Sequence, residues 1–379
     1  MRELIIDLDA IAANLNRMRA VAPTARVCAV VKANAYGHGM IPVAKRLVEE
    51  GVDYLGVADI AEALQLREAG IGGRILAWLH AHDEDFVAAL AAEIDLGVSS
   101  LGQLERILAA VPLAGRLARI HVKVDTGLGR NGILASALPQ LLAAVSEGVA
   151  AGDLQLVGVF SHLSCTSRED DLLQIANFEA AIGVFEEYGL TPELRHLTAS
   201  DGTLSYPQAH YDMVRIGVAL YGLSPYSDHN SADYGLTPAM TATARVSLVK
   251  RVPADTPVSY GYLYRTATET SLALVPVGYA EGLPRIATGE ATVWVQGASF
   301  PVASRIAMDQ FVIDVGDHPV APGDTVVLFG DPSKGYASAD QLAQAAQTIN
   351  YEIVTRMGGR FERRFLASGI LLNESEACA

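Results

Sequence analysis

Short apolar runs alternate with longer amphipathic segments from about residue 9 to residue 235. Each short run is rich in β-branched and small apolar residues, which is typical of a buried strand. Strands are predicted at 26–33, 54–58, 74–79, 94–99, 119–125, 156–163, 193–199 and 213–216. Helices are predicted between them, for example at 40–50, 60–69, 101–110 and 172–188. This alternation predicts an α/β fold with a (β/α)8 barrel, and an open, doubly wound parallel sheet fits it nearly as well.

The pattern changes near Leu236, beyond which strand-like runs follow one another without long helices. We therefore expect two domains: a barrel over 9–235, and a mostly β domain over 236–379 that also includes a strand within 1–8. The first strand, at 3–7, is expected to pair with the later sheet. The later strands are predicted at 240–252, 272–277, 291–295, 310–315 and 325–329, with one short helix at 338–347.

Charge and composition narrow the function. The net charge of −15 argues against a nucleic-acid partner, because phosphate backbones require a basic surface. No apolar run reaches the length of a membrane span, and the first residues lack the apolar core of a signal peptide. The three cysteines are widely separated and show no metal-ligand spacing, so we expect no metal site and a reducing, cytoplasmic location.

The string VVKANAYGHG at 30–39 places Lys32 where a predicted buried strand meets a glycine-rich turn. Burial lowers the pKa of a lysine, and a neutral lysine is a nucleophile for aldehydes and a base for acidic carbons. The plainer interpretation is that the Lys32 ammonium reaches water and takes part in no chemistry.

Other polar residues fall at the ends of the later predicted strands. In barrel enzymes these carboxyl ends carry the active site, so the residues are expected to meet there. Arg130 lies in a glycine-rich turn and offers a planar fork suited to a carboxylate. The set is Lys123, Arg130, His162, Ser200 and Arg215.

Several of these strings resemble the alanine racemases. They include VVKANAYGHG, KVDTGLGRNG at 123–132 and YDMVRIGVALYG at 211–222, and the resemblance covers about residues 4–366. It implies a barrel followed by a β domain and the cofactor pyridoxal 5′-phosphate, bound to Lys32 as an aldimine. It also implies that Lys32 is the catalytic base on one face of the substrate and Tyr260, in VSYGYLYR, the base on the other.

The resemblance assigns the remaining roles. Arg130 and Met308 would contact the substrate, and Lys123 would be carbamylated, with an unmodified lysine beside a bound anion as the alternative. His196 would support the site. The cofactor would be held by Tyr36, His162, Ser200, Arg215, Gly217, Val218 and Tyr351.

Arg215 is the most informative of these residues, because most pyridoxal enzymes place a carboxylate at the pyridine nitrogen. An arginine cannot accept a proton, so it would leave that nitrogen unprotonated and favour simple proton return. The chain departs from the family pattern in having Ala199, Ala307 and Glu281, and in the loop 165–171. These departures leave both bases in place, but they leave substrate breadth and the details of the gate open.

The expected function is interconversion of L- and D-alanine by two bases, supplying D-alanine for peptidoglycan. A homodimer is expected, in which the second domain of each chain completes the active site of the other. The alternatives are a racemase of broad specificity and a non-catalytic pyridoxal-phosphate carrier. Decarboxylases of basic amino acids share the architecture but have a carboxylate where Arg215 stands.

Overall fold

The computed structural model describes residues 2–378, which form two compact units. The first unit comprises Leu15–Ala33 and Ala44–Leu220, and it contains the barrel. The second comprises the described residues up to Asn14, the segment Asn34–Val43 and everything from Tyr221 onward.

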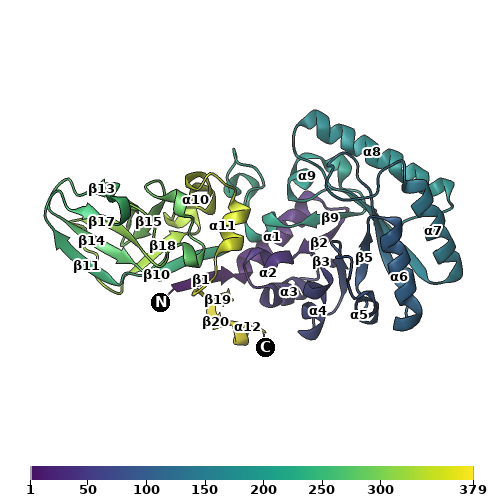
Figure 1. The fold of residues 1–379 in the computed structure, drawn as a ribbon, viewed down its shortest axis with the longest axis horizontal. Coiled ribbons are helices and arrows are strands. Elements are labelled where there is room, and N and C mark those ends of the chain that lie inside the picture. Colours follow the sequence, from purple (N-terminus) through teal and green to yellow (C-terminus); the bar gives the residue numbers. More distant parts are fainter. Residues whose placement is uncertain (1, 379) are drawn as a thin grey trace. The chain divides into compact units, whose positions relative to one another are not determined.

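Eight parallel strands form the barrel, which confirms the predicted fold class over the open sheet (Figure 1). Their order in the sheet is β8-β7-β6-β5-β4-β3-β2-β9. Backbone hydrogen bonds from Asp212 N to Arg195 O (3.1 Å) and from Arg215 N to Thr198 O (3.0 Å) connect the two end strands, so the barrel is nearly closed. The strands are β2 (Arg26–Val30), β3 (Tyr54–Val57), β4 (Arg74–Ala77), β5 (Asp95–Val98), β6 (Ala118–Lys123), β7 (Leu154–Phe160), β8 (Leu194–His196) and β9 (Met213–Ile216).

Helices alternate with these strands, as the amphipathic segments predict. Side-chain caps begin several of them; the Ser100 side chain, for example, accepts a hydrogen bond from the backbone N–H of Gln103. They are α4 (Ile60–Glu68), α5 (Phe86–Ala91), α6 (Leu101–Ala114), α7 (Leu138–Ala151), α8 (Arg168–Glu187) and α9 (Ser200–Ser205). Two more, α1 (Leu8–Val21) and α3 (Met40–Glu49), have residues in both units.

The strand predicted at 26–33 is shorter than expected. It ends at Val30, and Lys32 begins the short segment α2 (Lys32–Tyr36). Ala33, Asn34, Ala35 and Tyr36 have φ values of 52–54°, so this turn is left-handed. Left-handed backbone costs non-glycine residues about 1 kcal/mol or more each and is often found at functional sites.

The second unit contains a seven-stranded sheet in the order β16-β15-β18-β10-β1-β19-β20. The first strand does pair with the later sheet, antiparallel to β10 and parallel to β19. The strands are β1 (Arg2–Asp7), β10 (Met240–Arg245), β15 (Thr292–Val295), β16 (Ala298–Pro301), β18 (Thr325–Phe329), β19 (Glu362–Ala367) and β20 (Ile370–Asn373).

The run predicted as one strand at 240–252 is two strands in different sheets. The second, β11 (Leu248–Val252), belongs to a three-stranded sheet with β14 (Thr270–Val275) and β17 (Phe311–Gly316). The pair β12 (Pro257–Val258) and β13 (Tyr264–Arg265) lies beside the segment that carries Tyr260. The prediction of one helix was incomplete, since α10 (Ala339–Ala345) is followed by α11 (Asn350–Arg356) and α12 (Glu374–Cys378). Across residues 2–378, no helix is both long and apolar enough to cross a membrane.

Candidate functional site

Lys32 lies just beyond the carboxyl end of β2, close to the position that the sequence predicts. The Glu62 carboxylate fixes the backbone beside it, because it accepts hydrogen bonds from Ala33 N (2.6 Å) and Ala58 N (2.8 Å). The Nζ of Lys32 lies 6.0 Å from the centre of the Trp78 ring. Burial lowers the pKa of Lys32, and the nearby charge of Arg130 lowers it further. A larger neutral fraction of the amine suits both a nucleophile and a base.

Lys123 is the last residue of β6 and is buried. Burial lowers its pKa to about 8, and the charges of Arg215, Arg130 and Lys32 contribute to this shift. Arg130 is exposed on the loop that follows, whose turn is held by Asp125 Oδ1 accepting from Gly127 N and Gly129 N. The structure therefore brings Lys32, Lys123 and Arg130 together at one end of the barrel.

These three residues line a cavity of about 690 Å³. Sequence reasoning missed its other walls, although several of those residues lie at or just after the predicted strands 74–79 and 94–99. Their position at strand ends could have indicated these residues, but no recognisable motif surrounds them. They include Trp78, His80, Ser99, Ser100, Gln103 and Arg106.

Arg215, in β9, is buried and surrounded by acceptors. Its Nη1 donates to His196 Nδ1 (3.2 Å) and His196 O (3.0 Å). Its Nη2 lies within hydrogen-bond distance of Ser161 O (2.7 Å), Leu197 O (2.9 Å) and His162 Nδ1 (3.1 Å). Among residues 2–378, no protein acceptor binds its Nε–H, so that donor remains for a bound group.

His162 directly follows Ser161 at the end of β7, and it contacts Arg215 as expected of neighbours in one site. Burial lowers the pKa of His162 well below its ordinary value, and Arg215 and Arg130 lower it further. The imidazole is therefore neutral near pH 7, with an apolar ring face.

Ser200, Gly217 and Val218, predicted from separate strands, do lie together. The Ser200 hydroxyl accepts hydrogen bonds from Gly217 N (3.1 Å) and Ala219 N (3.3 Å). Ser200 begins α9, whose N-cap is Ala199 and has no side-chain cap. Because Ala199 has no polar side chain, the cap residue accepts no side-chain hydrogen bond from the first backbone N–H groups of α9.

The other predicted residues belong to the second unit. Tyr36 and Tyr351 are neighbours there, with ring centres 6.2 Å apart. Tyr260 and Met308 have exposed fractions of 74% and 54%. Tyr260 also lines a hollow of about 460 Å³ in this unit, together with Tyr262 and Gln310.

The barrel end fits an anionic ligand, and the amine of Lys32 is suited to bind an aldehyde. Three buried or half-buried cationic side chains and an exposed arginine lie near one another, and each lowers the pKa of at least one neighbour. Such crowding is costly unless a negative group binds between the cations. The described residues contain no cluster of three or more histidine, cysteine or carboxylate side chains that could hold a metal ion.

Comparison with known proteins agrees with this architecture. The family model for the N-terminal domain of alanine racemase matches residues 6–225, and that for the C-terminal domain matches 239–365. Alanine racemase of Salinispora tropica is 46% identical over 359 residues (94% of this chain, 95% of the relative). That of Frankia casuarinae is 47% identical over 366 residues (96% and 95%).

Solved structures give the same result. The alanine racemase of D-cycloserine-producing Streptomyces lavendulae aligns with a TM-score of 0.95 and 46% identity, covering 97% of each chain. That of Streptomyces coelicolor aligns with a TM-score of 0.95 and 43% identity, covering 97% of this chain and 98% of the other. The fold and site thus define a barrel enzyme of the racemase class, an isomerase. The chain belongs to the alanine racemase family.

Proposed function

We propose that this enzyme interconverts L- and D-alanine with pyridoxal 5′-phosphate bound at the carboxyl end of the barrel. Family membership supports the reaction, and the lowered pKa of Lys32 beside Lys123, Arg130 and Arg215 is the observation that carries the site. When bound, the cofactor acidifies the substrate's α-hydrogen by delocalising the negative charge left behind.

Several residues would hold the cofactor. Lys32 would bind its aldehyde carbon, and the Arg215 Nε–H would donate to its ring nitrogen. The neutral ring of His162 would pack against the cofactor ring, and Ser200, Gly217 and Val218 would bind its phosphate, with Tyr36 and Tyr351 of the second unit as further phosphate ligands. Arg215 keeps its own proton, since a guanidinium donates hydrogen bonds but does not accept them.

Racemisation requires removing a proton from one face of the α-carbon and returning one to the opposite face. Lys32 is the base on one face, because its lowered pKa favours the neutral amine. Tyr260 is the base on the other face. Arg130 binds the substrate carboxylate through its planar fork, and Met308 limits side-chain size. Carbamylated Lys123 would attract Arg130; an unmodified Lys123 would instead share a bound anion with it.

We also propose a homodimer in which Tyr260 reaches the partner's Lys32. The exposed fractions of Tyr260, Tyr262, Leu263 and Met308 are 74%, 61%, 60% and 54%, and exposed apolar clusters of this kind often mark interfaces. Two-fold symmetry would then create two equivalent sites. We also propose that the enzyme supplies D-alanine for cell-wall synthesis and that it is located in the cytoplasm.

The reaction is tested with each pure enantiomer of alanine in heavy water. Because enantiomers have equal free energy in water, both directions should reach the same racemic mixture, with deuterium at the α-carbon. Lysine and arginine serve as larger substrates and should turn over far more slowly. Comparable turnover would assign a broad-specificity racemase, and cofactor binding without α-exchange would assign a carrier.

The shared site is tested by mixing two inactive variants, Lys32→Ala and Tyr260→Phe. In a mixed dimer one site carries both changes and the other carries neither, so activity should return. Both variants must be folded, and Tyr260→Phe must bind cofactor. If verified mixed dimers of such variants stay inactive, Lys32 and Tyr260 do not meet across an interface.

A further inference from the structure

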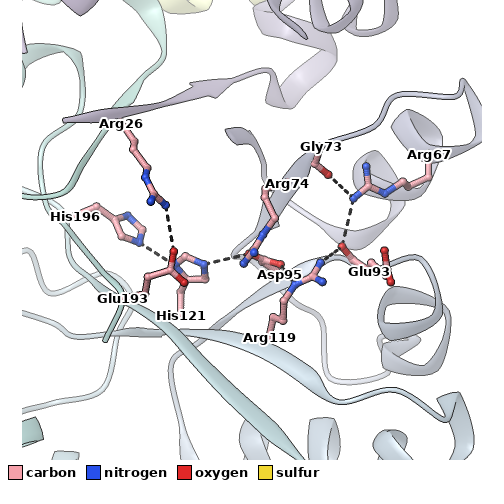
Figure 2. Close-up of polar contacts among 10 residues, drawn as sticks. All are labelled: Arg26, Arg67, Gly73, Arg74, Glu93, Asp95, Arg119, His121, Glu193 and His196. Carbon is pink, nitrogen blue, oxygen red and sulfur yellow. Dashed lines mark hydrogen bonds and ion pairs between the residues drawn. The ribbon is translucent and has the colours of Figure 1, made fainter. Parts of the chain in front are cut away.

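An unbroken line of polar contacts runs through the barrel core from Arg215 to Asp95. His196 Nε2 lies 3.0 Å from His121 Nδ1, and His121 Nε2 lies 3.4 Å from Asp95 Oδ2. Arg215 Nη1 joins the other side of His196 at 3.2 Å. Figure 2 shows the two imidazoles and Asp95 in sequence, with Arg74 and Arg119 around the carboxylate. Both histidines are fully buried.

The contacts fix which nitrogen of each histidine carries the proton. A guanidinium only donates, so Nδ1 of His196 must accept and its proton must sit on Nε2. That N–H donates to His121 Nδ1, which places the His121 proton on Nε2, facing Asp95. Every hydrogen bond in the line therefore points from Arg215 toward the carboxylate.

The Asp95 end prevents this direction from reversing. Arg74 Nη2 lies 2.7 Å from Oδ2, and Arg119 Nε lies 2.6 Å from Oδ1. Burial alone would raise the pKa of Asp95, but the hydrogen bond from His121 and the charges of the two guanidinium groups lower it. Asp95 is consequently ionised near neutral pH and can only accept hydrogen bonds.

The surrounding core makes room for the line. A Cβ at Gly158 would lie 2.3 Å from His121 Nδ1, so any larger residue there would displace that imidazole. The His196 ring stacks on Phe160, with centres 4.8 Å apart and planes 3° from parallel. Both rings are thus held where their nitrogens meet, as the buried aspartate of a catalytic triad holds its histidine.

We propose that His196 and His121 are positioning residues that keep Arg215 oriented, with its Nε–H free for the cofactor's ring nitrogen. The inference deepens the proposed role of Arg215 and rests on the proposed function. If the line reversed, His196 would present an N–H to Arg215, and two donors would face each other. Arg215 would then turn away from the ring nitrogen.

The protonated nitrogens can be observed directly in the holoenzyme labelled with ¹⁵N-histidine. The chain has nine histidines, and single His→Gln variants assign their signals. His196 and His121 should both carry a proton on Nε2 and accept a hydrogen bond through Nδ1. An Nδ1–H at either residue would overturn the proposal. This measurement needs no turnover, so its failure is distinct from failure of the proposed reaction.

Substitution tests whether the line matters for Arg215. His121→Phe removes the acceptor for His196 and should lower kcat roughly tenfold, shift the cofactor's absorbance and leave KM for alanine nearly unchanged. His121→Gln offers both an acceptor and a donor and should recover most of the loss. His210→Phe is the control, because buried His210 contacts Thr203 O (2.8 Å) outside the line. If His121→Phe and His210→Phe give the same kcat and spectrum, His121 does not position Arg215.

Discussion

The two ends of the barrel arrange charge in opposite ways. At the carboxyl end, Lys32, Lys123 and Arg215 lie close to one another, and mutual repulsion contributes to the lowered pKa values of both lysines. At the amino end, charges of opposite sign lie together: Asp95 pairs with Arg74 and Arg119.

More pairs follow at the amino end. Arg195 lies 2.8 Å from Asp212. Arg26 lies 3.2 Å from Glu193 (Figure 2). The same eight strands thus hold a charge-balanced end that stabilises the fold and a cation-rich end that is suited to binding an anion. Unfavourable electrostatics confined to one end of a barrel are characteristic of its active site.

Removing Lys32 should have the largest effect on activity. Lys32→Ala takes away both the cofactor's covalent attachment and one of the two bases, so kcat/KM for alanine should fall by at least about 10⁴-fold. Stability should not fall, because the substitution removes one of several neighbouring positive charges. Measuring turnover and denaturant unfolding on the same preparation checks both. A variant that retained a tenth of the activity would show that another residue is the base.

At the amino end the expected effect is on stability. Asp95→Asn removes the buried charge that both Arg74 and Arg119 contact, and it should cost about 3 kcal/mol of unfolding free energy. Asp153→Asn changes an exposed aspartate in the same unit and should cost less than about 0.5 kcal/mol. Equal unfolding midpoints for the two variants would contradict the role of Asp95.

The same carboxylate predicts an acid limit. The folded-state pKa of Asp95 is about 2, below its ordinary value of 3.8. Its stabilisation, about 2 kcal/mol, is therefore complete above pH 4 and lost as the pH falls toward 2. Asp95→Asn should lack this part of the acid dependence, which unfolding measured from pH 5 to 2 would reveal.

Lys123→Met should raise the stability of the fold, whereas Asp95→Asn should lower it. Because the folded-state pKa of Lys123 is about 8, its charge destabilises the fold at neutral pH, and wild-type stability should rise as the pH increases from 8 toward 10.5. The substitution should raise the unfolding free energy by about 2 kcal/mol at pH 7 in anion-free buffer. Lys334→Met is the exposed control. A loss of stability would indicate that Lys123 carries a negative modification, which intact mass would detect.

The smallest effect is expected at Arg26. Its partner Glu193 is about half exposed, as is Arg26 itself, and exposed ion pairs contribute about 0–1 kcal/mol. Arg26→Ala should therefore change the unfolding free energy by less than about 1 kcal/mol. A larger loss would mean that the outer pairs of the amino end, and not Asp95 alone, stabilise the barrel.

Local patterns predicted the strands well, because each barrel strand is a short apolar run bounded by turn residues. Most observed boundaries, such as Arg26 and Tyr54, lie within a few residues of the predicted ones. The position of Lys32 just after a buried strand was predicted from its own string. The left-handed turn that follows it was not, since nothing in ANAY requires positive φ and strain of that kind depends on the surrounding structure.

The line from Arg215 to Asp95 was beyond sequence reasoning for a different reason. His121 is a lone histidine in an apolar strand, and its partners come from β5 and β8, which meet only when the barrel closes. The two strands within 240–252 were merged because neither glycine nor proline separates them, and only their different partners distinguish them. Pairing between distant segments leaves little trace in local composition.

The direct test of the account is the pKa of Lys32. The chain has five lysines, so ¹³C labelling of their ε-carbons gives few signals, which Lys→Arg variants assign. In cofactor-free protein, Lys32 should titrate below the ordinary lysine value of 10.5, and Arg130→Gln should move its midpoint upward. A Lys32 signal that titrates at the ordinary value in both proteins would contradict a cation-rich carboxyl end that prepares this amine for chemistry.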